Sequence, residues 1–295
     1  MISIVITSFK EPGTIGKAIE SFVNQDIKEK YELIVSAPDK ETQGIVEKYA
    51  KRNKKVKLFK DPGKGKTYAL NMLLPKLKGR IIILSDGDVY VSENSVNGLL
   101  KLFEDKKVGC ATGKPVSINL RDNILGYWSH LLCYGAHRMR LRRDKKREFL
   151  ECSGYLWAFR NKLISQIPRE TAEDSIVPLL LYLKGYKIKY VPLAEVYVKY
   201  PSNLYEFISQ KKRTSKAHET LVNFTDLKKI PRMKSLKNET LESYILFSFP
   251  KSIKEIFWTA LLFPVRLYIW ISSFFALYLR RDSKIDGWQT VETTK

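Results

Sequence analysis

Short runs of apolar, β-branched residues alternate with longer amphipathic stretches through the first part of the chain. The runs have the length and composition of strands, and the stretches between them have the spacing of helices. Strands that alternate with helices are typical of an α/β domain, in which helices flank a mostly parallel sheet. The runs that predict strands are residues 2–8, 32–36, 56–60 and 80–84.

A second pattern lies near the C-terminal end, where residues 256–279 are almost all apolar or aromatic. As a helix, these 24 residues would reach roughly 36 Å at about 1.5 Å per residue, whereas a hydrocarbon core is about 30 Å thick. Pro264 and Arg266 disfavour a simple span. We therefore expect interfacial helices or a re-entrant hairpin, with residues 244–250 as its first arm. A buried helix pair of a soluble protein is the alternative.

The chain has 295 residues, of which 44% are hydrophobic, enough for one large core and a smaller appendage. We expect an α/β domain over residues 1–220, a linker over 221–242, and membrane-associated helices with a tail over 243–295. The chain opens on a strand-like run without a secretory leader, so we expect the α/β domain on the cytoplasmic side of the cell membrane. Three isolated cysteines fit a reducing compartment.

The formal charge of +21, from 52 basic and 31 acidic residues, indicates an anionic partner. The densest basic cluster, residues 138–147, follows an aromatic-rich segment, residues 124–134. Aromatic and basic residues in this order suit a helix that lies on an anionic membrane surface. A solvated basic face beside an ordinary core helix is the alternative. We expect a membrane rather than a nucleic acid as the partner.

The acidic signature Asp86-Gly87-Asp88 follows the apolar run 81–84. Side chains two residues apart on an extended segment point the same way, so both carboxylates can face one divalent cation. Such a cation relieves their repulsion and neutralises a charged leaving group such as a diphosphate. Hard oxygen ligands select Mg²⁺ or Mn²⁺. A surface turn is the alternative, because Asp-Gly and Gly-Asp are common turn dipeptides.

Polar residues also follow the other predicted strands. Ligands of parallel sheets bind at the carboxyl ends of the strands, so we expect these side chains to form one site. Gly-Lys-Thr at residues 65–67 raises a second interpretation, the phosphate loop of an NTPase. That loop needs a glycine five residues earlier, where this chain has Lys60. The polar residues at the predicted strand ends are Thr7, Ser8, Ser36, Asp39, Asp86 and Asp88.

Four segments occur in the order that a nucleotide-sugar transferase needs: residues 1–9, 86–88, 173–174 and 210–213. Together they resemble the family-2 inverting glycosyltransferases with a GT-A fold, and the last two resemble the cellulose-synthase-like and hyaluronan-synthase-like branch. The sequence departs from that pattern at two positions. Asp39 stands alone where the family usually has two adjacent aspartates, and Thr214 replaces the tryptophan of processive members.

The resemblance implies a role for each matching residue. Asp174 would be the general base, with Glu173 orienting it or the acceptor, and helix capping is the alternative for both. Gln210 and Arg213 lie on one helical face and would hold the diphosphate and acceptor, unless this helix is simply basic and solvated. The implied acceptor residues are Ser153 and Gly154, the implied metal ligands are Asp88 and Asp86, and the implied nucleotide-sugar-binding residues are Thr7, Ser8, Phe9, Glu11, Ser36, Asp39, Lys66, Asp86, Gly87 and Asp88.

These features lead us to expect a membrane-associated, inverting glycosyltransferase that depends on Mn²⁺ or Mg²⁺. It would move one hexose, for example mannose, from a GDP- or UDP-linked donor to a polyprenyl- or dolichyl-linked acceptor in glycan assembly. A small processive polysaccharide synthase is the first alternative. The alternative from another class is a non-enzymatic basic protein that binds nucleic acid or an anionic membrane, which the charge alone supports.

Overall fold

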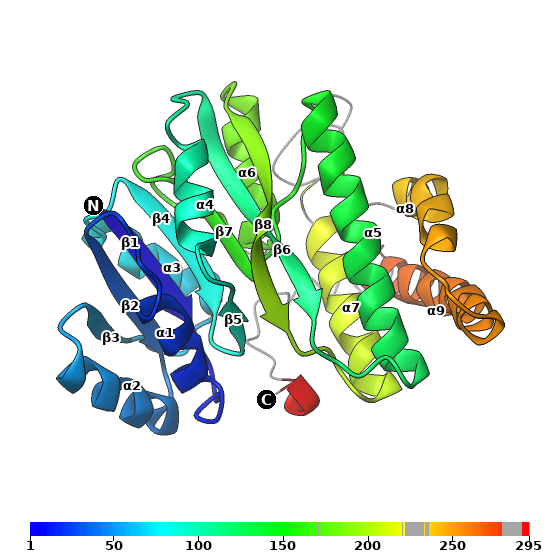
Figure 1. Ribbon diagram of the computed structural model, residues 1–295, viewed down its shortest axis with the longest axis horizontal. Helices are drawn as coiled ribbons and strands as arrows, with labels where there is room; N and C mark the ends of the chain where they lie inside the picture. The colour runs from blue at the N-terminus through cyan, green and yellow to red at the C-terminus, as the bar shows by residue number, and fades with distance from the viewer. Residues whose placement is uncertain (170, 220, 222–232, 234–235, 279–290, 295) are drawn as a thin grey trace.

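The computed structural model describes residues 1–169, 171–219, 221, 233, 236–278 and 291–294. An eight-stranded sheet lies at its centre, in the order β3-β2-β1-β4-β7-β6-β8-β5 (Figure 1). The strands are β1 Ile2–Thr7, β2 Tyr31–Ala37, β3 Val56–Lys60, β4 Ile81–Asp86, β5 Val89–Val91, β6 Val108–Ser117, β7 Leu156–Arg160 and β8 Lys187–Val198.

The first half of the sheet is parallel, with β1 between β2 and β4. All six residues of β1 are buried, as expected for a strand that has helices on both faces of its sheet. Beyond β4 the sheet becomes mixed, because β7 runs antiparallel to both of its neighbours while β6 and β8 are parallel. The expectation of an α/β domain with a mostly parallel sheet is confirmed, as are the four predicted strands.

Helices cover both faces of the sheet. Ile4 and Ile6 of β1 point to the face covered by α1, α2 and α4, whereas Val5 packs with residues of α3 and α6 on the other face. The α-helices are α1 Ile15–Val23, α2 Lys40–Arg52, α3 Lys66–Leu73, α4 Ser95–Leu102, α5 Ile124–Lys146, α6 Glu173–Leu183, α7 Leu204–Glu219, α8 Leu236–Glu242 and α9 Ile253–Tyr278, and the 3₁₀ helices are η1 Leu74–Lys76, η4 Ser243–Ser248 and η5 Glu292–Thr294.

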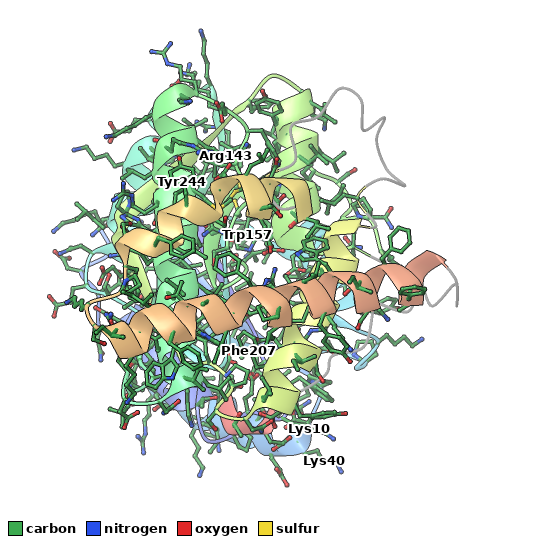
Figure 2. All side chains as sticks on the ribbon, turned by 90° about the vertical axis from the view of Figure 1, so that its right-hand side faces the viewer. Lys10, Lys40, Arg143, Trp157, Phe207 and Tyr244 are labelled. Carbon is green, nitrogen blue, oxygen red and sulfur yellow. The ribbon has the colours of Figure 1, made fainter. Side chains whose placement is uncertain are left out.

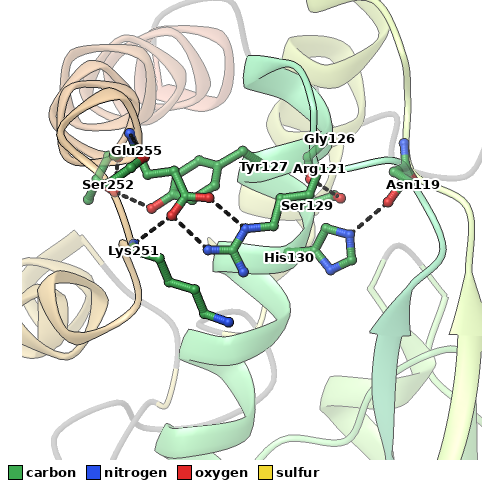
Figure 3. Close-up of polar contacts among 10 residues, drawn as sticks. Asn119, Arg121, Gly126, Tyr127, Ser129, His130, Lys251, Ser252 and Glu255 are labelled. Atoms are coloured by element: carbon green, nitrogen blue, oxygen red, sulfur yellow. Dashed lines mark hydrogen bonds and ion pairs between the residues drawn. The ribbon is translucent and has the colours of Figure 1, made fainter.

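The aromatic segment 124–134 forms the first half of α5, and its rings pack inside the protein. Tyr127 and Trp128 are 0% and 3% exposed, and Trp128 Nε1 donates to the backbone oxygen of Trp258 on α9 at 2.7 Å. Figure 3 shows a second link, in which Arg121 donates to both carboxylate oxygens of Glu255 at 2.8 Å. The expectation that this segment lies on a membrane is therefore wrong for Tyr127 and Trp128, which pack against α9 inside the protein.

Helix α9 lies across α5 and α7 (Figure 2). By length and composition, Ile253–Ala276 is apolar enough to cross a membrane. Its central Arg266, however, faces the protein, where it donates to Glu239 of α8 at 2.6 Å. Leu262 and Ile269 on the same side are buried. The outer side of α9 carries the exposed apolar residues Ile256, Phe257, Leu267, Ile271, Phe274 and Phe275, here called the α9 outer face.

The region expected to link the α/β domain to these helices contains structure of its own. Helix α8 occupies the end of the expected linker, residues 221–242, and η4 occupies most of the expected first arm, residues 244–250. Glu242 joins α8 to α5 through ion pairs with Arg142 and Arg143. Residues 222–232 and 234–235 of the expected linker, and residues 279–290 of the expected C-terminal region, lie outside the described residues.

Candidate active site

A cavity of about 990 Å³ lies where the carboxyl ends of β1 and β4 meet α5, α6, α7 and α9. Its volume is at the upper end of the range of about 300–1,000 Å³ that is usual for ligand pockets. The cavity brings together predicted site residues that are up to 206 positions apart in the sequence, from Thr7 to Arg213. The predicted site residues that line it are Thr7, Phe9, Glu11, Lys66, Asp86, Asp88, Ser153, Gly154, Glu173, Asp174, Gln210 and Arg213.

The signature Asp86-Gly87-Asp88 connects β4 to β5 at the floor of this cavity. The Gly87 backbone N–H donates to the carbonyl of Thr7 at 2.9 Å, and the Thr7 hydroxyl donates to Asp86 Oδ1 at 3.2 Å. A Cβ atom at Gly87 would lie 2.5 Å from Glu11 Oε2, closer than real contacts allow. Glycine at this position therefore lets the Glu11 carboxylate approach the two aspartates.

Burial and neighbouring negative charge raise the pKa of two carboxylates on this floor, Glu11 and Asp88. Burial and the charge of Asp88 raise the pKa of Glu11 well above its ordinary value, although Ser8 donates to Glu11 at 2.7 Å. Burial and the charge of Asp86 raise the pKa of Asp88 from 3.8 to about 7. Glu11 and Asp88 thus resist ionisation, first because they are buried and then because a neighbouring carboxylate carries negative charge. A nearby cation would remove this cost.

Lys66, at the start of α3, supplies one positive charge to the site. Its Nζ lies 2.6 Å from Asp86 Oδ1 and 2.6 Å from Glu173 Oε1. Burial acts to lower the pKa of Lys66, but the charges of Asp86 and Glu173 raise it above its ordinary value, so the ammonium group stays charged. Lys66 therefore joins the predicted metal ligands to the predicted catalytic acid pair.

The acid pair Glu173-Asp174 occupies the first turn of α6, where the helix dipole favours negative charge. Neither acid caps this helix, because the N-cap position belongs to Ala172. The backbone N–H of Cys152 donates to the carbonyl of Asp174 at 3.1 Å, and a Cβ atom at Gly154 would lie 3.3 Å from Asp174 Oδ2. The expected acceptor segment and the expected base are thus direct neighbours.

Helix α7 brings Gln210 and Arg213 to the opposite wall of the cavity. The charge of Arg213 acts to lower the pKa of Asp88, which places the guanidinium close to the acidic floor. Gln210 Oε1 is buried and accepts no hydrogen bond from the part of the chain that the structure describes. A buried acceptor without a partner inside a cavity is suited to a ligand hydroxyl.

A comparison of the sequence with known protein families agrees with the arrangement of residues in this cavity. The sequence profile described as glycosyl transferase family 2 matches residues 3–167, more than half of the chain. The chain belongs to glycosyltransferase family 2. The non-enzymatic alternative, which rested on charge alone, is therefore not favoured.

Three curated proteins show how far the similarity to this glycosyltransferase extends. The probable glycosyltransferase YdaM of Bacillus subtilis is 25% identical over 236 residues, 75% of this chain and 56% of YdaM. The poly-beta-1,6-N-acetyl-D-glucosamine synthase of Staphylococcus aureus is 23% identical over 234 residues, 75% of this chain and 55% of that protein. A beta-monoglucosyldiacylglycerol synthase of a Nostoc species is 27% identical over 135 residues, 43% of this chain and 28% of that protein. The chain spans about half the length, or less, of these relatives.

Solved structures confirm the GT-A fold of the glycosyltransferase. The mannosyltransferase PcManGT of Pyrobaculum calidifontis, solved with GDP-Man and Mn²⁺, has a TM-score of 0.64 and 18% identity; the match covers 96% of this chain and 83% of that one. TarS of Staphylococcus aureus has a TM-score of 0.50 and 18% identity, over 85% of this chain and 44% of TarS. At these identities the likeness concerns the fold.

The structure does not bring every predicted residue of the glycosyltransferase to the cavity. Ser36 is fully buried and donates to Asp61 at 2.8 Å. Asp39 caps α2, where it accepts the Thr42 N–H at 2.9 Å, and it lines a separate, smaller cavity with Lys10. Contact of Ser36 or Asp39 with the nucleotide stays a prediction.

The cavity also contains residues that the sequence did not single out as site residues of the glycosyltransferase. Arg140 of α5 and Trp270 of α9 line it, as does Tyr155, which follows the acceptor segment. No motif marks them. Local spacing gives no signal for Arg140 either, because the charged residues around it on α5 leave no regular apolar face.

Proposed function

We propose that this glycosyltransferase moves a single hexose, with mannose as the first candidate, from a GDP- or UDP-linked donor to a lipid-linked acceptor. The observation that carries the proposal is the extent of the cavity. It continues from Asp88, which follows β4, and Asp174, on α6, to apolar side chains of α5, η4 and α9. An acceptor with a polar headgroup and a long apolar chain matches both ends of this cavity.

The acidic end of the cavity accounts for the transfer step. As the acceptor oxygen bonds to the anomeric carbon, Asp174 accepts the proton of the acceptor hydroxyl. The bond from the anomeric carbon to the diphosphate breaks at the same time, and the nucleoside diphosphate leaves with the electron pair. Attack from the side opposite the diphosphate inverts the anomeric centre. Gly154 keeps open the space beside Asp174 that the acceptor needs.

A divalent cation fits the floor of the cavity. Asp86, Asp88 and Glu11 offer hard oxygen donors whose mutual repulsion a cation would relieve. Within the described residues, no set of three His, Cys, Asp or Glu side chains is already arranged around a metal position. When bound, Mn²⁺ or Mg²⁺ would act as a Lewis acid on the leaving diphosphate. The Mn²⁺ in the complex of PcManGT with GDP-Man supports this proposal.

A membrane surface is the proposed location, with the α/β domain on the cytoplasmic side. The α9 outer face presents large apolar side chains to the outside, among them Phe257 at 61% and Phe274 at 57% exposure. The protein covers the other side of α9, so a helix held along the α/β domain suits an in-plane position better than a span. The name of the Nostoc relative describes a glycolipid, which supports a lipid acceptor.

A processive polysaccharide synthase is the second candidate. The similarity to the poly-beta-1,6-N-acetyl-D-glucosamine synthase favours it. Thr214 disfavours it, because the family resemblance places a tryptophan at this position in processive members. The two candidates differ in product length: one hexose per acceptor for the first, and a polymer for the second.

Donor hydrolysis and transfer by the detergent-purified chain test the proposal. GDP- and UDP-sugars are supplied with Mn²⁺, with or without polyprenyl phosphate or a polyprenyl diphosphate sugar. We expect one donor to be consumed faster when lipid is present, to give a product with one added hexose. The variant Asp174→Asn should lose this turnover, whereas Asp122→Asn, an exposed substitution outside the cavity, should keep it. Polymer formation without lipid would refute the proposal and favour the synthase.

A further inference from the structure

Arg140 carries a buried positive charge that pairs with no acidic side chain of the described residues. The residue is 3% exposed and lines the cavity. Its Nε donates to the carbonyl of Glu151 at 3.0 Å and its Nη2 to the carbonyl of Cys152 at 3.3 Å. Across the described ranges, no carboxylate forms an ion pair with it. A buried charge held only by carbonyl dipoles has an unmet need for an anion.

Other arginines near the cavity show the contrast. Arg142 and Arg143, on the same helix, share the carboxylate of Glu242. Arg266 of α9 pairs with Glu239 at 2.6 Å. Each of these guanidinium groups has a negative partner within the protein, whereas Arg140 forms no ion pair with a carboxylate of the part of the chain that the structure describes. This difference, and not its position on a basic helix, distinguishes Arg140.

The position of Arg140 relates its charge to the transfer step. Arg140 holds the carbonyl of Cys152, and the N–H of Cys152 donates to the carbonyl of Asp174. Two residues later, the Gly154 backbone lies beside the Asp174 carboxylate. A group bound by Arg140 would therefore lie next to the acceptor segment, on the acceptor side of the proposed base.

Part of the cavity wall is apolar. Ala136 lies one helical turn before Arg140 on α5 and also lines the cavity, with Leu246 of η4 and Leu262 of α9. The same helix α9 presents its outer face to the outside of the molecule. An anion bound at Arg140 could therefore be attached to an apolar chain that leaves between these helices.

We propose that Arg140 binds the phosphate of a phosphorylated long-chain lipid, so that the acceptor of this enzyme carries a phosphate. The guanidinium suits a phosphate because its N–H groups match two phosphate oxygens. The inference deepens the proposed function and rests on it for the identity of the ligand as acceptor. Binding of the lipid phosphate is a separate property that needs no transfer.

Binding in the absence of a donor tests this inference. Three probes are titrated into the full chain in detergent: a polyprenyl phosphate, the corresponding polyprenol, and inorganic phosphate. The wild-type protein should prefer the polyprenyl phosphate to the polyprenol by roughly 10- to 100-fold, the range expected for hydrogen bonds to a charged group. Arg140→Gln should reduce this preference to less than about threefold, and Arg140→Lys should keep an intermediate preference.

The matched control is Arg138→Gln, which removes an exposed guanidinium from the same helix and should keep the full preference. If Arg140→Gln does not fold, Ala136→Phe tests the route independently, because the added ring would fill the apolar wall and weaken binding of polyprenyl phosphate at least tenfold. Unchanged binding in Ala136→Phe, or an unchanged preference in folded Arg140→Gln, would overturn the inference. So would equal affinity for polyprenyl phosphate and inorganic phosphate.

The two proposals fail in different ways. If no donor is consumed but Arg140 still determines the preference for lipid phosphate, the phosphate site stands and the transfer reaction does not. If hexose is transferred equally well to a lipid without phosphate, the transferase stands and the phosphate site is refuted.

Discussion

Replacing Asp88 by asparagine should stabilise the metal-free protein at pH 8 while abolishing donor turnover. The pKa of the Asp88 carboxyl is about 7 in the folded protein, against an ordinary value of 3.8. A raised pKa means that the folded state prefers the protonated carboxyl. The stability associated with this proton is complete below about pH 4 and is lost as the pH rises to 7. Above pH 7 the folded wild type carries the full cost of ionised Asp88.

The size of the effect follows from the shift of about three pKa units, each worth about 1.36 kcal/mol, which gives at most about 4 kcal/mol. Asp88 borders a cavity open to water, so screening reduces the expected gain to about 2 kcal/mol. For a domain of this size, that gain corresponds to a rise in melting temperature of roughly 4–8 °C. At pH 4 the two proteins should melt at nearly the same temperature.

Thermal unfolding in detergent, followed by circular dichroism with a chelator present, measures the difference. Asp105→Asn is the matched control, because the hydrogen bond from Lys187 lowers the pKa of this exposed aspartate, so its removal should not stabilise at pH 8. Adding Mn²⁺ should raise the melting temperature of the wild type and not that of Asp88→Asn. A variant that melts at or below the wild-type temperature at pH 8, or that gains equally at pH 4, would refute the reasoning.

Three further substitutions test other parts of the site. Gly154→Val should lower transfer at least tenfold without lowering the melting temperature, because its methyl groups would enter the space beside Asp174; unchanged transfer rates would contradict this. Lys66→Met should lower the free energy of unfolding by about 2 kcal/mol in urea denaturation, since it breaks two partly buried ion pairs. Adding Glu173→Gln should restore stability, because it removes a carboxylate that has lost its partner, and unchanged stability of the double variant would contradict this. Glu239→Gln should speed hydrogen exchange in α9 by roughly tenfold, because Arg266 loses its charge partner; exchange that is unchanged throughout α9 would count against it.

The sequence determined the α/β domain and most of the acidic site. The strands β1 to β4 are apolar runs of the right length, and polar residues follow them, which predicted one site at the strand ends. The pairing of Thr7 with Asp86 came from the sheet topology. The two-residue spacing of an extended segment predicted that the side chain of Asp88 points the same way as that of Asp86. Glu173-Asp174 and Gln210 were recognisable through a family resemblance, because short motifs keep their order along the chain even where overall identity is low.

Tertiary structure alone decided where the aromatic and basic residues of α5 point. Local patterning gave Tyr127 and Trp128 the composition of a membrane-facing segment, yet α9 covers them from more than one hundred positions away in the sequence. Likewise, the sequence alone shows Arg266 as an unfavourable charge in an apolar run, whereas the fold pairs it with Glu239 of α8.

Arg140 shows most clearly that the local sequence does not determine the surroundings of a side chain. On the sequence it is one of several arginines in a basic cluster; in the fold it is the buried one that faces the cavity with carbonyl groups as its protein partners. Burial and charge balance depend on contacts between distant segments, which local spacing does not encode. The sequence therefore determined which chemical groups lie at the strand ends. The packing of α5 against the sheet, and of α9 against α5 and α7, decided which other side chains line the same cavity.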